Sequence, residues 1–211
     1  MPRYFIEVAY KGTAYAGFQK QENANTIQAE IEKAMQVLYR FPFELTGSSR
    51  TDAGVHAAQN FFHFDTDKFE TRELTGDIYH LNAILPGDIV VKRLFKVKDD
   101  AHCRFDALWR LYEYSIYNSK NPFLADRAYF FPFKIDQLLL QEAAALVIAN
   151  WDFTAFSKKN TQVHSFICSI YESEWLKTDD CLVYRVKANR FLRGMVRGLV
   201  ATMLKTGTGK S

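Results

Sequence analysis

The chain has 211 residues, of which 48% are hydrophobic and 15% aromatic, enough for one large domain or two small ones and too apolar for a disordered chain. Its three cysteines lie far apart without a C-x-x-C pair, which argues against a zinc ribbon or a disulfide framework. This cysteine usage fits a reducing compartment, and no apolar stretch reaches the roughly 20 residues that a transmembrane helix needs, so we expect a soluble cytoplasmic protein with no membrane partner. The formal net charge is +3.

The first half of the chain has the pattern of strand, helix, loop, strand, helix and strand. Apolar residues alternate near the start and then recur at helical spacing, in a segment whose start resembles a capping box at Asn25 and Gln28. The expected elements are a strand at 3–10, a helix at 26–40, a loop at 46–57, a strand at 59–65, a helix near 73–83 and a strand near 88–97.

The second half repeats the order of strand, helix and further strands. Here we expect a strand at 110–117, a helix at 136–149 capped by Asp136, strands near 165–176 and 181–189, and a last helix at about 190–205. This order predicts an α+β protein of two related subdomains, residues 1–105 and 106–211, with helices mainly on one face of antiparallel or mixed sheets. No sequence repeat accompanies it.

Charge is distributed unevenly along the chain. No acidic residue follows Asp180, and a segment of one sign suits a polyanion such as nucleic acid, although a solvated basic face would have the same composition. Arg190, Arg193 and Arg197 recur at intervals of three and four, which predicts one shared helix face. The basic residues of this segment are Arg185, Lys187, Arg190, Arg193, Arg197, Lys205 and Lys210.

The loop at residues 47–57 gathers glycine, hydroxyl groups, an arginine, an aspartate and a histidine. Such residues are ordinary in turns, but binding and catalytic groups also gather on loops held by a scaffold. A serine nucleophile with His56 and Asp52 is one possibility, although no G-x-S-x-G elbow is present. A metal site of Asp52, His56 and His63 is another, although its spacing matches no familiar ligand pattern. A lone carboxylate held by an arginine is the third.

Within this loop, Arg50-Thr51-Asp52-Ala53-Gly54-Val55-His56-Ala57 resembles the signature of the tRNA pseudouridine synthase A (TruA) family. Further segments are similar to motifs of that family in the same order, so the resemblance runs almost from end to end. These segments are residues 10–19, 101–107, 110–114, 152–156 and 188–197.

The resemblance implies a pseudouridine synthase fold of two ferredoxin-like subdomains and isomerisation of uridine at tRNA positions 38, 39 and 40, in a homodimer without cofactor or metal. It implies that Asp52 is the catalytic nucleophile or base and that Arg197 supports its carboxylate. An arginine suits this role because it stays charged and can bind a carboxylate through two nitrogens. The implied substrate-binding residues are Tyr112, Arg50, His56 and Gln19.

The chain departs from the family pattern in two places. Its last motif has Leu192 and Arg193 where relatives often have a His-His pair, and family members usually continue by a helical segment beyond the position of Ser211. Two other functions remain open. One is a non-catalytic RNA-binding or tRNA-chaperone module of the same fold, and the other is a hydrolase that uses His56 with Ser49.

Overall fold

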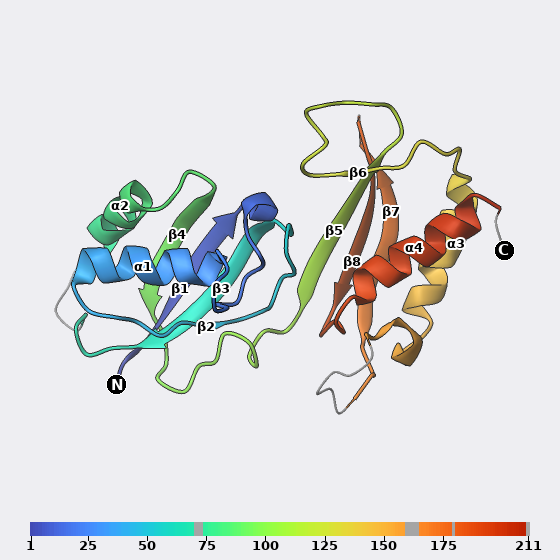
Figure 1. Cartoon of the computed structure of the whole chain (residues 1–211). Coiled ribbons are helices and arrows are strands. Elements are labelled where there is room, and N and C mark those ends of the chain that lie inside the picture. Colours follow the sequence, from blue (N-terminus) through green and yellow to red (C-terminus); the bar gives the residue numbers. More distant parts are fainter. Residues whose placement is uncertain (70–73, 159–164, 179, 210–211) are drawn as a thin grey trace. The chain divides into compact units, whose positions relative to one another are not determined.

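The structure is a computed structural model that describes residues 1–69, 74–158, 165–178 and 180–209. The chain forms two compact units, Met1–Ala107 and Leu108–Ser211, which Figure 1 shows in ribbon form. The first residue of the helix expected near 73–83 and Lys210 of the basic segment lie outside the described residues. None of the helices in the described ranges combines the length and apolar character that crossing a bilayer requires.

The first unit is a four-stranded antiparallel sheet with two helices. Its strands lie in the order β2-β3-β1-β4, and both neighbours of β1 run antiparallel to it. Two strand–helix–strand connections with this order make a ferredoxin-like unit. The elements are β1 (Arg3–Tyr10), the 3-10 helix η1 (Gly12–Ala14), α1 (Ile27–Tyr39), β2 (Thr46–Gly47), β3 (Ala57–Asp65), α2 (Thr75–Ile84) and β4 (Ile89–Lys96).

Alternation along β1 places Ile6 and Val8 in the core, each fully buried against the apolar stripe of α1. The N-cap of α1 is Thr26, whose hydroxyl accepts a hydrogen bond from the backbone N–H of Ala29. The capping box expected at Asn25 and Gln28 is therefore wrong by one residue. The side chain of Gln28 instead donates to the carbonyl of Leu45 and to Glu32.

The second unit repeats this arrangement with one change. Its strands lie in the order β6-β5-β8-β7, so that β7, β8 and β5 correspond to β2, β3 and β1. The edge beside β5 is taken by β6, a two-residue parallel strand that the sequence pattern did not predict. The two subdomains are thus related in topology. The elements are β5 (Arg110–Tyr117), β6 (Tyr129–Phe130), α3 (Gln137–Ile148), the 3-10 helix η2 (Thr154–Phe156), β7 (Ile170–Lys177), β8 (Leu182–Ala188) and α4 (Met195–Gly207).

The predicted cap of α3 is confirmed, because the Asp136 carboxylate accepts from the backbone N–H groups of the first turn. Helix α4, in contrast, starts five residues later than expected. Asn189 is held by two hydrogen bonds with the backbone of Ser169, and Gly194 precedes the helix with a φ of 78°, in the left-handed region. Residues 190–194 therefore form a loop, and Phe191 and Leu192 belong to it rather than to the helix.

Candidate functional site

The loop that carries Asp52 connects β2 to β3 at one end of the first sheet. The backbone N–H of Val55 donates to the carbonyl of Asp52 at 3.2 Å, which closes a turn. Gly54 occupies the third position of this turn with a φ of 79°, a conformation that glycine adopts without strain. The turn leaves the Asp52 side chain partly exposed, so that a substrate atom could approach its carboxylate.

A buried polar network fixes the start of this loop to the sheet. The side-chain amide of Asn60 donates to the Tyr10 hydroxyl at 3.0 Å, and that hydroxyl lies 2.9 Å from Oγ1 of Thr51. On the other side of the amide, Oδ1 of Asn60 accepts from Ser48 at 2.6 Å and from Ser49 at 3.1 Å. Because Tyr10 and Asn60 lie on β1 and β3, the two central strands of the sheet, the network anchors the residue before Asp52 to the middle of the sheet.

The segment after β1 packs directly on the same loop. Phe18 donates its backbone N–H to the carbonyl of Thr51 at 3.1 Å, and the backbone N–H of Gly12 donates to Nδ1 of His56 at 2.9 Å. Gly12 lies so close to the carbonyl of Val55 that a Cβ atom there would overlap it. The segment 10–19 therefore contacts the aspartate loop at two places, through Phe18 at Thr51 and through Gly12 at His56.

A cavity of about 260 Å³ lies beside the loop within the first unit. Gln19 and Arg50, two of the predicted substrate-binding residues, both line it. Arg104 and Phe105 line it as well, although the sequence reasoning assigned them no role. Their place in the segment 101–107, which resembles a family motif, was the signal that could have identified them.

In the second unit, Tyr112 lies on β5 and Arg197 on α4. Tyr112 is partly buried and meets the Phe191 ring edge-on at 5.0 Å between centroids. Tyr114, two residues along the same strand face, has a pKa raised by burial and by Tyr129, while the Arg197 charge acts in the opposite direction. The electrostatic influence of Arg197 thus reaches the face of β5 on which Tyr112 also lies.

The expected arginine stripe is not present on α4. Arg190 and Arg193 precede the helix, in the loop that ends at Gly194, and Arg197 alone of the three is helical. The three arginines therefore do not share a helix face, because residues 190–194 are not helical.

The other chemistries considered for the loop find less support. A serine nucleophile would donate its hydroxyl hydrogen bond to a histidine, but the Ser49 hydroxyl donates to Asn60. His63 lies on β3 and groups with His102 and Cys103, not with Asp52 and His56. Burial, with smaller effects of Arg3 and His102, lowers the pKa of His63 to about 4, so its imidazole is neutral at pH 7.

Comparison with known proteins agrees with this geometry. The sequence model of the tRNA pseudouridine synthase family matches residues 6–106 and 143–211. Proteins named tRNA pseudouridine synthase A are similar over nearly the whole chain. The one from Porphyromonas gingivalis is 42% identical over 100% of this chain and 84% of its own length. Those from Parabacteroides distasonis and Staphylococcus aureus are 40% and 39% identical, over 100% and 99% of this chain and 83% and 79% of their own lengths. The chain therefore belongs to the tRNA pseudouridine synthase family.

Proposed function

We propose that this chain isomerises uridine to pseudouridine in the anticodon stem-loop of tRNA, at positions 38, 39 and 40, with Asp52 as the catalytic carboxylate. The observation that carries the proposal is the position of Asp52 in a turn held by Tyr10, Asn60 and Thr51, in a chain that belongs to this family. The relatives named tRNA pseudouridine synthase A support tRNA as the substrate, and a tRNA-modifying enzyme would act in the cytoplasm.

The reaction breaks the bond between C1′ of the ribose and N1 of uracil, turns the base, and joins C1′ to C5. The proton on C5 leaves to solvent and N1 takes up a proton, so the product is an isomer of the substrate; no electrons are exchanged with another molecule, and the reaction requires no cofactor. A carboxylate can attack C1′, or it can remove a proton from the sugar. Asp52 could perform either step, as nucleophile or as base.

A base stacked inside an RNA stem cannot reach a carboxylate, so the target nucleotide must be turned out and held. The cavity beside the loop offers the cations Arg50 and Arg104, the amide of Gln19 and the ring of Phe105. Guanidinium groups bind phosphates, an amide can bond to a base edge, and an aromatic ring can stack on a base. We assign these side chains to the nucleotides flanking the target.

The roles of the remaining predicted site residues stay part of the proposal. Tyr112 would contact the target uridine, and its partly buried ring beside Phe191 is suited to stacking. Arg197 would keep the catalytic carboxylate ionised. His56 would keep the loop in place through its bond with the backbone of Gly12 in addition to any contact with RNA.

The test is release of tritium from unmodified tRNA transcripts labelled at C5 of uridine, with no cofactor added. Asp52→Ala and Asp52→Asn should abolish release while tRNA binding, measured by fluorescence anisotropy, is retained. Asp67→Asn is the matched control, because Asp67 is an exposed aspartate of the same unit, and it should behave as wild type. Transcripts with cytidine at positions 38, 39 and 40 should release no tritium.

Two results would refute the proposal. If wild type binds tRNA but releases no tritium, the chain is a binding module rather than an enzyme. If both Asp52 variants release tritium at the wild-type rate, the catalytic group lies elsewhere. Turnover of small ester substrates that stops in Ser49→Ala would instead support a hydrolase.

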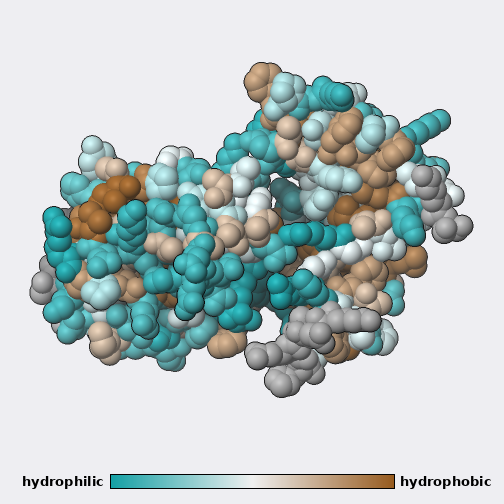
Figure 2. Space-filling view, viewed as in Figure 1, coloured by the Kyte–Doolittle hydropathy of each residue, from teal (hydrophilic) through white to brown (hydrophobic). Residues whose placement is uncertain are grey.

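We also propose that the chain acts as a homodimer. Helix α3 exposes large apolar side chains, with 76% of Leu138 and 65% of Leu146 accessible, and Figure 2 shows hydrophobic surface on the second unit. Large exposed apolar side chains gathered on one element are a feature of association surfaces. Light scattering should give twice the mass of one chain, and Leu138→Glu with Leu146→Glu should shift the protein toward monomer. A wild-type monomer at micromolar concentration would contradict the proposal.

A further inference from the structure

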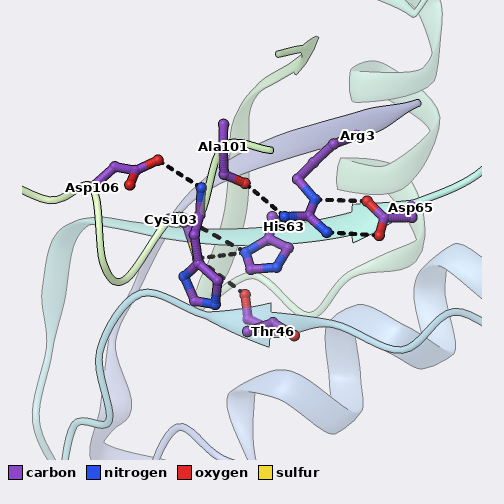
Figure 3. Close-up of polar contacts among 8 residues, drawn as sticks. Arg3, Thr46, His63, Asp65, Ala101, Cys103 and Asp106 are labelled. Atoms are coloured by element: carbon purple, nitrogen blue, oxygen red, sulfur yellow. Dashed lines mark hydrogen bonds and ion pairs between the residues drawn. The ribbon is translucent and has the colours of Figure 1, made fainter. Parts of the chain in front are cut away.

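A cluster of nitrogen and sulfur ligands lies outside the aspartate loop. His63, His102 and Cys103 each present one such atom, and the three atoms lie within 4.8 Å of one another. His63 comes from β3, whereas His102 and Cys103 belong to the segment that follows β4. The cluster therefore joins the sheet to the segment that carries Arg104 and Phe105. Figure 3 shows Cys103 and His63 directed toward each other beside Thr46.

The spacing suits a metal ion. Zinc holds imidazole nitrogen and thiolate sulfur at bond lengths that place tetrahedral ligands about 3.3–3.8 Å apart. Sγ of Cys103 lies 3.1 Å from Nδ1 of His63 and 3.2 Å from the carbonyl oxygen of Thr46. The three ligand atoms lie within 4.8 Å of one another, so no pair exceeds the tetrahedral spacing by more than about 1 Å.

The surroundings of the cluster permit a cation. Nδ1 of His102 accepts two long hydrogen bonds, from the backbone N–H groups of Arg104 at 3.2 Å and Phe105 at 3.3 Å. Both contacts lie at the long end of the hydrogen-bond range, so a metal bond to the imidazole of His102 would compete only with weak contacts. The nearby guanidinium of Arg3 makes two hydrogen bonds with Asp65, which balances its charge.

We propose that His63, His102 and Cys103 bind one transition-metal ion of the Zn²⁺ class, with water as a further ligand on the half-exposed side of His102. The Cys103 thiol releases its proton to solvent as the sulfur–metal bond forms. This site departs from the sequence-based expectation of no metal. Its role is structural, because it ties the segment bearing Arg104 and Phe105 to β3, and it does not depend on the proposed tRNA activity.

The test uses the full chain, stripped with a chelator under reducing conditions and then titrated with Co²⁺. We expect one equivalent to produce visible bands of a four-coordinate ion and a near-ultraviolet thiolate band, and Zn²⁺ should abolish both. Cys103→Ser should lose the thiolate band. Cys181→Ser, which alters a cysteine of the second unit, should retain it.

A second pair of variants covers the case in which Cys103→Ser fails to fold. His102→Ala should weaken Co²⁺ binding by at least about tenfold, the loss that even an outer partner of a metal site can cause. His80→Ala, an exposed histidine of α2, should bind as wild type. The proposal is overturned by a folded wild type without a thiolate band, by a band that persists in folded Cys103→Ser, or by unchanged affinity in His102→Ala. Because every readout is spectroscopic and contains no RNA, these outcomes are separate from those of the tritium assay.

Discussion

Replacing Tyr10 by phenylalanine tests how firmly the aspartate loop is held. The change removes one oxygen atom from a side chain that is 5% exposed, and with it the hydrogen bonds of 2.9 Å to Thr51 and 3.0 Å to Asn60. A hydrogen bond contributes about 0.5–1.5 kcal/mol net, so two of them correspond to a loss of about 1–3 kcal/mol in the free energy of unfolding. The Asn60 amide is buried, which favours the upper part of that range.

The assay is urea unfolding followed by circular dichroism, with tritium release measured on the same samples. Tyr79→Phe is the matched control, because Tyr79 is 75% exposed on α2 and its replacement should change the free energy of unfolding by less than about 0.5 kcal/mol. We expect Tyr10→Phe to lower the rate of tritium release as well, since Thr51 precedes Asp52 and loses an anchor.

A double-mutant cycle of Tyr10→Phe with Asn60→Ala isolates the bond between the two side chains. Residues in one hydrogen-bond network show coupling energies of about 0.5–3 kcal/mol, so the two losses should not add. Equal stability of Tyr10→Phe and Tyr79→Phe, or strict additivity in the cycle, would refute the view that this network holds the loop.

Three further predictions follow from the same structure. Gly12→Ala should destabilise by about 1–3 kcal/mol in urea, because its Cβ would overlap a backbone carbonyl, whereas Gly76→Ala, at a helical position with no atom within 4 Å, should stabilise by up to about 1 kcal/mol. Burial raises the pKa of Glu7, but hydrogen bonds from Gln59 on β3 and Arg93 on β4 outweigh burial and hold the pKa below the ordinary glutamate value of 4.5. Its ionised form therefore stabilises the fold above pH 4.5, and the stability difference between wild type and Glu7→Gln should shrink as the pH falls through the lowered pKa; a pH-independent difference would contradict this. Arg197→Ala should cost far more tritium release than Arg193→Ala, and equal losses would argue against a special role for Arg197.

Sequence periodicity located most of the regular elements because it reports local geometry. The alternation at 3–10 and 110–117 corresponds to β1 and β5 residue for residue, and the carboxylate of Asp136 caps α3 as expected. In each case the signal lies within a few residues of the element it predicts.

Signals failed where a distant contact decided the conformation. Apolar pairs at helical spacing predicted a last helix beginning at about residue 190. Asn189, however, is hydrogen-bonded to Ser169, and the helix begins at Met195. The parallel strand β6 is two residues long, too short for any periodicity, and exists because β5 pairs with it.

The sequence by itself determined the order of the helices and the longer strands, the two related halves and the aspartate loop, since each is a pattern of neighbouring residues. The two-residue strands β2 and β6 have no such pattern. Only the tertiary structure brought Tyr10 to Asn60, Gln19 to Arg50, and His63 to His102 and Cys103. Those groupings depend on which strands become neighbours and in what register, and the pairing of β1 with β3 joins residues about fifty positions apart. Local pattern carries no information about that choice, because it is made by burial of the whole core.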